Sequence, residues 1–417
     1  EADLAGLAAI VNGTAAVQDD FSGKTVILDN DLNLNNQEWT PVGTAAVTVS
    51  NDNAVFRAAD SKGFAGTFDG GGYVIYNLKI SGEKSGIGLF GYISGGTVKN
   101  LTVRGSVAGG YFCGGLAGVC GGEISDVNNE ADVYGTGNYI GGICGEASGK
   151  IALTRCENTG SVSNTSNTRS SGYIAGILGR ADTYCSGSIK ECSNKGAVTG
   201  YQYVAGIIGG QFGDVDVAAC YNTAKITGVS FGKVYLAGIA GKSGGGTITD
   251  CYNRGDLYDR HWSQGHIRAV GGIAGCEEGR NDGTLAISNC YNTGKIDFNT
   301  ENMEYGSNWI YEVGNISGGN STTSYNMMKY SGCYYLENRI AIADPTHEAY
   351  KLWADVYKAD SAIWDTAYIT KATEAELKGA EVLQGLGSAF RADNSNINDG
   401  YPILYWQIDD VQDAEEY

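Results

Sequence analysis

Small apolar residues recur along this chain in two alternating patterns. One is an apolar run bracketed by glycine, such as Gly88-Leu-Phe-Gly91 or Gly271-Gly-Ile-Ala-Gly275. The other places an apolar residue three positions before a Cys-x-Asn-x-Gly-x-Val segment, as at Cys156–Val162. The pair of patterns occurs seven times between Gly86 and Ile296, at intervals of 26 to 39 residues. A period of this length indicates one supersecondary unit stacked on copies of itself.

Alternation within the second pattern indicates which side chains face inward. In a strand, side chains two positions apart share a face, so Cys156, Asn158 and Val162 lie together, and the apolar members make that face the interior. Inward asparagines at one repeat position can bond one another, and we expect such an amide ladder. The predicted ladder asparagines are Asn129, Asn158, Asn194, Asn222, Asn253 and Asn292. The matching cysteines, which we expect to be buried, stacked free thiols with isolated disulfides as the alternative, are Cys156, Cys192, Cys220, Cys251 and Cys290.

The spacing between inward residues also predicts a bend in each unit. The apolar residue three positions before the cysteine is separated from it by an odd number of steps. Both side chains can face inward only if the backbone bends or bulges between them. Two or three short strands joined by glycine corners, closing about every 30 residues, describe an all-β, right-handed parallel β-helix.

The repeat divides the chain into three predicted regions. They are an N-terminal cap with the first coils (residues 1–85), the repeat β-helix (residues 86–318) and a mixed α/β capping region (residues 319–417). In the first region we expect a helix near Asp3–Val11. In the last we expect a helix from Thr346 and a second that begins with a capping box at Thr373-Glu-Ala-Glu376. Such caps cover the strand edges that a β-helix exposes at its ends.

The composition narrows the range of partners. The 417 residues carry a formal net charge of −19, from 28 basic and 47 acidic side chains. Nucleic acids and anionic membranes attract Lys/Arg patches, so we expect neither as a partner, and no apolar run is long enough for membrane insertion. The chain has 64 glycines and only three prolines, which suits central strands that need every backbone N–H and disfavours helical repeats.

Several of these segments resemble those of a known group of proteins. Gly88-Leu-Phe-Gly91 and Gly271-Gly-Ile-Ala-Gly275 are similar to the GLUG motif of bacterial surface proteins, and Thr40-Pro-Val-Gly43 and Asn398–Trp406 resemble their lead-in and close. The resemblance implies an extracellular protein, secreted or attached to the cell wall, and a monomeric part of a larger surface protein. Such repeats occur in adhesin-like proteins and beside the catalytic domains of immunoglobulin A peptidases. Those peptidases need a His-Glu-x-x-His zinc helix, which this chain lacks, so the resemblance supplies no catalytic residue.

Two columns of aromatic residues are candidate binding surfaces. Tyr221, Tyr252 and Tyr291 each follow the repeat cysteine, and alternation points them outward on three consecutive coils. Stacked outward rings offer flat faces to sugars, and the alternative is that they only stabilise the flank of the β-helix. A second column, which precedes the glycine-bracketed run, comprises Phe112, Tyr139, Tyr173, Tyr203 and Tyr235. Alternation does not settle which way this column faces, and packing competes with ligand binding as its role.

An insertion and several acidic groups are further candidates. Residues 258–268 interrupt a coil and carry His261, Trp262 and His266. The insertion is either a plain solvated loop or a binding loop, and a metal site is disfavoured because no third ligand accompanies the histidines. Asp214 and Asp216 share one side of a strand, about 7 Å apart, as the two carboxylates of a glycan-cleaving enzyme would. The Asx-rich turns at residues 29–31 and 393–399 are candidate calcium sites, and no other cofactor is expected.

Together these features favour a non-catalytic adhesion module of a bacterial surface protein, with a glycan or a host surface glycoprotein as its partner. The alternative is a carbohydrate-active β-helix enzyme, a glycoside hydrolase or polysaccharide lyase that acts on host or dietary glycan. A structural stalk, which holds another domain away from the cell, is a third hypothesis.

Overall fold

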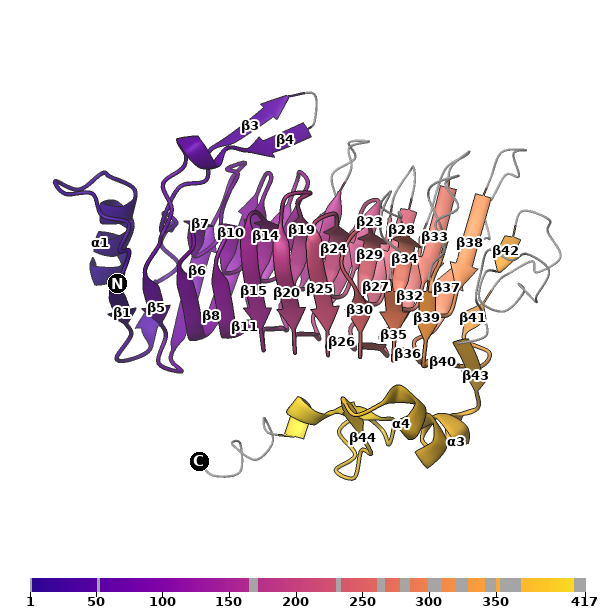
Figure 1. The fold of residues 1–417 in the computed structure, drawn as a ribbon. Helices are drawn as coiled ribbons and strands as arrows, with labels where there is room; N and C mark the ends of the chain where they lie inside the picture. The colour runs from indigo at the N-terminus through magenta and orange to yellow at the C-terminus, as the bar shows by residue number, and fades with distance from the viewer. Residues whose placement is uncertain are drawn as a thin grey trace.

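The chain winds into a stack of parallel coils, a parallel β-helix (Figure 1). The computed structural model describes residues 2–50, 53–164, 172–229, 234–260, 267–277, 286–298, 310–319, 329–341, 350–352 and 369–408. Helix α1 (Ala2–Val11) lies at the N-terminal end of the stack. No helix in the described segments has the length and apolar character needed to cross a membrane.

Three sheets run along the stack. Within the described residues, the largest sheet has 26 strands and contributes up to three successive legs to each coil. Its first legs are β1 (Thr25–Ile27), β5 (Thr67–Asp69), β8 (Thr97–Gly109), β11 (Glu123–Asn129), β15 (Lys150–Thr154), β20 (Ser186–Lys190), β25 (Asp214–Ala218), β30 (Ile248–Thr249), β35 (Ala286–Ser288) and β39 (Lys329–Ser331). The second legs are β2 (Leu32–Asn33), β6 (Val74–Ile80), β16 (Glu157–Asn158), β21 (Ser193–Asn194), β26 (Tyr221–Asn222), β31 (Tyr252–Asn253), β36 (Tyr291–Asn292), β40 (Cys333–Leu336) and β43 (Ile369–Ala372), with β8 and β11 running on into this position. The third legs are β12 (Asp132–Gly135), β17 (Val162–Asn164), β22 (Val198–Gly200), β27 (Ile226–Gly228), β32 (Leu257–Asp259), β37 (Ile296–Phe298) and β41 (Ile340–Ala341).

The other two sheets complete each coil and meet at the glycine-bracketed runs. The eight-stranded sheet comprises β9 (Cys113–Gly114), β13 (Ile140–Gly141), β18 (Tyr173–Ala175), β23 (Tyr203–Ala205), β28 (Val234–Ala237), β33 (Ile267–Gly271), β38 (Ile310–Gly314) and β42 (Tyr350–Leu352). The seven-stranded sheet comprises β7 (Phe90–Ile93), β10 (Ala117–Cys120), β14 (Cys144–Ala147), β19 (Leu178–Ala181), β24 (Ile208–Gln211), β29 (Ala240–Ser243) and β34 (Ala274–Glu277). Glycine is required at the corner between them: a Cβ on Gly176 would lie 2.1 Å from the side-chain oxygen of Asn194.

A left-handed backbone residue forms the predicted bend. The residue just before the repeat cysteine has a positive φ, as at Arg155 (49°), Glu191 (56°) and Asp250 (55°). The bend separates the first leg of the coil from the second. It leaves both the apolar residue and the cysteine inside, as shown by Ile189 and Cys192, which are completely buried. The prediction that an odd spacing requires a bend is therefore confirmed.

The interior contains the predicted amide ladder. Each asparagine donates from Nδ2 to Oδ1 of the asparagine on the next coil at 2.8 Å, in an unbroken series from Asn129 to Asn292. All six are fully buried. The repeat cysteines stack beside them, and the backbone N–H of Cys156 lies 3.4 Å from Sγ of Cys192. No disulfide links the eleven cysteines, all of which lie in described segments, so the ladder and the stacked thiols are both confirmed.

The coils continue beyond the recognisable repeat. Strands β39, β40, β41 and β43 extend the largest sheet, so the stack passes the predicted boundary near residue 319. The signature fades there because Tyr335 takes the ladder position after Asn292. Tyr350–Leu352 forms strand β42, paired with β38, so the helix predicted across this segment is wrong at these residues. Strand pairing with a neighbouring coil overrides local helix propensity.

The chain then turns back along the outside of the stack. Residues 373–408, here named the C-terminal arm, contain α3 (Glu374–Leu377), α4 (Ala380–Leu386), β44 (Phe390–Arg391), β45 (Ile403–Leu404) and the 3₁₀ helix η3 (Tyr405–Ile408). Helix α3 begins with the predicted capping box between Thr373 and Glu376. The arm lies along one flank of the coils (Figure 1), and Nε1 of Trp406 donates to the carbonyl oxygen of Ala219 at 2.9 Å. A hairpin of β3 (Val47–Ser50) and β4 (Asn53–Phe56), followed by η1 (Ala58–Asp60), projects near the N-terminal end.

Candidate functional site

The first tyrosine column is covered by the C-terminal arm. Tyr221, Tyr252 and Tyr291 stack with ring centroids 4.9 and 5.0 Å apart, but they are only 5, 1 and 0% exposed. Their rings share a cluster with Leu377 and Phe390 of the arm, separate from the coil interior. The prediction that they form an exposed strip for sugars is therefore wrong. They do point away from the coil core, as alternation indicates, and the arm occupies the face that a sugar would use.

Hydrogen bonds to the tyrosine hydroxyls hold the arm in place. Tyr291 donates to the carbonyl oxygen of Pro402 (2.6 Å), and Nε2 of Gln407 donates to the hydroxyl of Tyr252 (2.9 Å). Trp406 stacks on Tyr221 at 5.6 Å. Burial raises the pKa of Tyr252 and of Tyr291, so both hydroxyls stay protonated and able to donate. The column stabilises the fold.

The second aromatic column also packs against protein. Tyr203 and Tyr235 are 7 and 3% exposed, and they stack in series with Tyr173 at centroid distances of 4.5 and 4.8 Å. The rings lie on the opposite face of their strands from core residues such as Val204. Cationic side chains cover them: the Arg180 guanidinium lies 4.1 Å from the centre of the Tyr139 ring. Neighbouring rings of the column and the covering cations occupy the ring faces that a ligand would use, so the packing alternative describes this column.

A buried ion pair lies beside the second column. Arg180 contacts Glu146 with Nη2 and Oε2 2.6 Å apart, and Nη1 of Arg180 donates to the hydroxyl of Tyr139 at 3.0 Å. Glu146 is only 2% exposed. Burial raises its pKa to about 7, an effect that the neighbouring Arg180 charge opposes only in part. Inaccessibility makes this carboxyl a poor candidate for chemistry on a large substrate.

The remaining predicted site residues are those of the insertion, the paired aspartates and the Asx-rich turns. His261, Trp262 and His266 lie outside the described residues. Asp214 and Asp216 are exposed on one face of β25, and Oδ1 of Asp216 accepts bonds from the backbone N–H (2.9 Å) and the hydroxyl (2.7 Å) of Thr247. That pairing gives Asp216 a role in holding the next coil.

The carboxylates of the Asx-rich turns are engaged by backbone N–H groups or by a cationic side chain. Asp31 accepts from the N–H of Val74 at 2.8 Å, and Asp393 accepts from the N–H groups of Ile397, Asn398 and Gly400. Asp399 pairs with Arg254 at 2.5 Å. Within the described segments, no group of three or more His, Cys, Asp or Glu side chains is placed to hold a metal ion.

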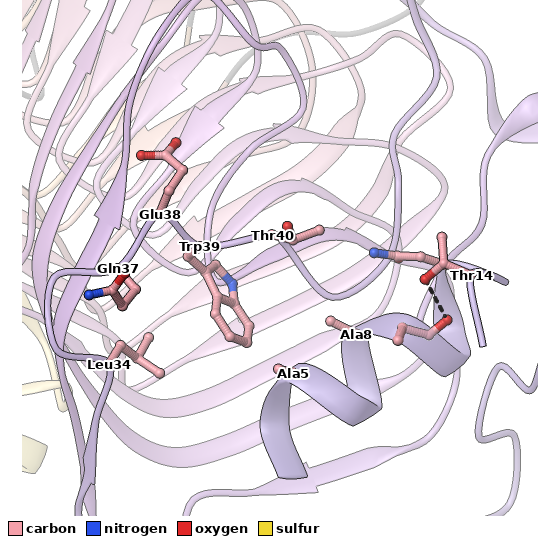
Figure 2. Close-up of a pocket in the computed structure, with 10 residues that line it drawn as sticks. Ala5, Ala8, Thr14, Leu34, Gln37, Glu38, Trp39 and Thr40 are labelled. Atoms are coloured by element: carbon pink, nitrogen blue, oxygen red, sulfur yellow. Dashed lines mark hydrogen bonds between the residues drawn. The ribbon is translucent and has the colours of Figure 1, made fainter. Parts of the chain in front are cut away.

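A cleft of about 290 Å³ lies between α1 and the first coil. Figure 2 shows the ring of Trp39 between the helix residue Ala8 on one side and Leu34 with Gln37 on the other. The backbone N–H of Trp39 donates to the carbonyl oxygen of Lys79, and its indole Nε1 donates to that of Leu89 at 3.0 Å. Both donors are therefore used within the fold, and the ring contributes an apolar wall to the cleft.

One buried polar atom in the cleft lacks a partner. Asn12, which directly follows α1, is 7% exposed, and its Nδ2 donates to the carbonyl oxygen of Pro41 at 3.0 Å. Its Oδ1 is buried and accepts no hydrogen bond from any described residue. A buried acceptor left without a donor costs about 1–3 kcal/mol. A ligand hydroxyl in the cleft would satisfy it.

Two further polar side chains that line the cleft, Glu38 and Thr14, can accept hydrogen bonds. Glu38 receives bonds from the backbone N–H and the hydroxyl of Ser81 at 2.8 and 2.7 Å, and these bonds lower the pKa of its carboxyl, which is therefore charged at neutral pH. Thr14 donates its hydroxyl to the carbonyl oxygen of Ala9 (3.2 Å), which leaves its oxygen able to accept. An apolar ring wall beside fixed acceptors is an arrangement that suits a hydroxylated ligand with one apolar face.

No sequence pattern marks this cleft. Trp39 and Asn12 both lie before the repeat, where no periodicity marks them. The local signals are weak: an asparagine just after a short helix and a tryptophan before Thr40-Pro41. Only the docking of α1 against the first coil brings the two residues into one site.

Comparisons with known proteins give limited likenesses. No family model matches the chain. Over 148 residues, which are 34% of this chain, the sequence is 32% identical to halomucin of Haloquadratum walsbyi, and the match spans 2% of the length of halomucin. A crystal structure of a Bacteroides ovatus protein provisionally described as an immunoglobulin A1 protease gives a TM-score of 0.43 and 18% identity, covering 92% of this chain and 87% of that one. Neither likeness assigns a ligand to this chain.

Proposed function

We propose that this chain is an extracellular, non-catalytic module of a bacterial surface protein that binds glycan in the cleft beside α1. The observation that carries the proposal is the pairing of the Trp39 ring with the orphaned Oδ1 of Asn12 in one small cleft. Sugars present an apolar ring face and a set of hydroxyl donors, and these two groups match both features. The resemblance of the repeats to the GLUG motif and the partial likeness to halomucin support an extracellular setting.

The C-terminal arm distinguishes this chain from a plain rod of coils. The arm returns along the coils, so that Nε1 of Trp406 donates to the carbonyl oxygen of Ala219, and it covers the column formed by Tyr221, Tyr252 and Tyr291.

A glycan array with the intact chain tests the proposal. We expect saturable binding to one class of glycan, with the printed glycans unaltered after incubation. Binding should fall in Trp39→Ala and persist in Tyr184→Ala, a matched control because Tyr184 is 90% exposed on a turn that does not line the cleft. An array without any signal would contradict glycan binding. Consumption of a printed glycan that stops in Asp214→Asn would favour the enzyme instead.

A further inference from the structure

We infer that the cleft beside α1 selects a single neutral sugar residue and excludes acidic sugars such as uronic or sialic acids. The inference rests on the proposed function, because it specifies the ligand class for the same site. It depends on three features of the described residues: the size of the cleft, the identity of its fixed polar groups and the sign of its electrostatic environment.

The size of the cleft limits the ligand to about one ring. Binding sites for drug-sized molecules occupy about 300–1,000 Å³. The cleft, at about 290 Å³, is slightly smaller than the lower limit of that range. Its apolar lining consists of Ala5, Ala8 and Ala9 from α1 facing Leu34 and Trp39 from the coil. The alanine face has no long side chains to fill the cleft, and the Trp39 side chain opposite it is 6% exposed.

Two polar groups of the cleft, on Asn12 and Glu38, require hydrogen-bond donors from the ligand, while Gln37 and Thr40, which also line it, carry groups that can donate or accept. Oδ1 of Asn12 is an acceptor without a donor, and the carboxylate of Glu38 is an acceptor only. The Nδ2 group of Asn12 is already used by Pro41. A sugar hydroxyl donates to such groups, whereas a carboxylate or sulfate of an acidic sugar has only acceptors to offer. An acidic group placed here would leave Oδ1 of Asn12 unsatisfied.

Glu38 gives the cleft a negative charge. Among the described residues it is the one charged side chain that lines the cleft, and Lys84, whose Nζ lies 3.7 Å from Oε1 of Glu38, offsets this charge in part. Asn12 follows the C-terminal end of α1, where the helix dipole places partial negative charge. The ammonium of Lys62 is directed at the backbone oxygen of Asn12 (2.8 Å) and does not line the cleft. The net charge of −19 adds to the repulsion at longer range.

The test uses pairs of sugars that differ only in charge. Methyl glucoside and methyl glucuronide differ only at C6, which is a hydroxymethyl group in one and a carboxylate in the other. Methyl galactoside, methyl mannoside and methyl N-acetylglucosaminide extend the neutral series. Titrations with the intact chain, followed through the indole N–H resonance that is absent in Trp39→Phe, report binding at this cleft. We expect at least one neutral glycoside to bind, and its uronate counterpart to bind about tenfold more weakly or not at all.

Two variants separate the role of charge from that of shape. Glu38→Gln removes the negative charge and keeps one carbonyl acceptor, so it should raise the affinity for the uronate relative to the neutral glycoside, a gain of acidic binding that loss of structure does not produce. Asn12→Ala should weaken binding of the neutral glycoside by about tenfold, with thermal unfolding as the check on folding. Trp39→Phe, which retains an aromatic wall, keeps the site testable if Trp39→Ala fails to fold.

The outcomes distinguish this inference from the proposed function. Glycan binding that depends on Trp39 but prefers acidic sugars would overturn the inference and leave glycan binding standing. Neutral-sugar binding unchanged in folded Asn12→Ala would place the site elsewhere and overturn the inference in the same way. The absence of binding to any glycan would overturn both.

Discussion

The amide ladder should carry a large share of the stability, and Asn194→Ala measures it. Asn194 is completely buried and takes part in three side-chain hydrogen bonds. Its Nδ2 donates to the carbonyl oxygen of Gly196 (3.0 Å) and to Oδ1 of Asn222 (2.8 Å), and its Oδ1 accepts from Asn158 (2.8 Å). Two of the three bonds join neighbouring coils.

The expected loss follows from counting these bonds. Each net hydrogen bond contributes about 1 kcal/mol, and an acceptor left buried without a donor costs about 1–3 kcal/mol. Alanine removes all three bonds and leaves the carbonyl of Gly196 without that donor, while Asn222 keeps a long bond from Ala224 (3.3 Å). We therefore expect the free energy of unfolding to fall by about 3–5 kcal/mol.

The first residue of the ladder provides a second measurement. Asn129 is equally buried and also takes part in three side-chain bonds, two with the backbone of Ala131 (2.9 and 3.3 Å) and one to Oδ1 of Asn158 (2.8 Å). Its loss would leave Oδ1 of Asn158 without a donor from the described residues, so Asn129→Ala should also lower the free energy of unfolding by about 3–5 kcal/mol. Urea unfolding followed by circular dichroism gives both values. A loss below about 1 kcal/mol at either position would refute the view that the amide ladder stabilises the stack.

Three further predictions concern the bend, the buried ion pair and the arm. Glu191→Asn should raise stability by about 0.5–1 kcal/mol, because asparagine adopts the left-handed conformation at φ 56° more readily; an unchanged urea midpoint would contradict this. Burial raises the pKa of Glu146 from its ordinary 4.5 to about 7. Between these pH values the carboxyl is therefore protonated in the folded state and ionised in the unfolded state. Stability should then fall as pH rises from about 4.5 to 7, by on the order of 3 kcal/mol, and Glu146→Gln should abolish that slope in melting curves measured across the range. Trp406→Ala removes the stacking on Tyr221 and the bond to Ala219, so limited proteolysis should cleave the arm sooner while the coils stay intact.

The repeated part of the fold was predictable because its physics is local and periodic. A cysteine and an asparagine two positions apart must face the same way, and a stack of such units places like residues on like residues. The positions of Asn194 and Cys192 follow from these two rules. Even the left-handed bend at Glu191 follows from the spacing of inward residues, although which residue adopts it does not.

The position of the C-terminal arm was not predictable in the same way. Alternation correctly points Tyr252 away from the core, yet whether that face meets solvent depends on a segment about 150 residues later, through Gln407. No periodicity links two such positions. The same limit applies to Tyr350–Leu352, whose strand conformation depends on pairing with β38 on an earlier coil.

Residues of the repeated coils and residues of the cap formed by α1 therefore differ in their roles. A residue that recurs on every coil, such as the ladder asparagines or the stacked tyrosines, is already engaged by its own copies, with bonds of 2.8 Å or ring distances near 5 Å. Its groups are satisfied before any ligand arrives. Asn12 has no copy above or below it, because α1 occurs once and covers the first coil, and its oxygen is left without a donor. Binding capacity in this solenoid is thus expected at the N-terminal end of the stack, where the fold leaves a buried polar group of a cleft for another molecule to satisfy.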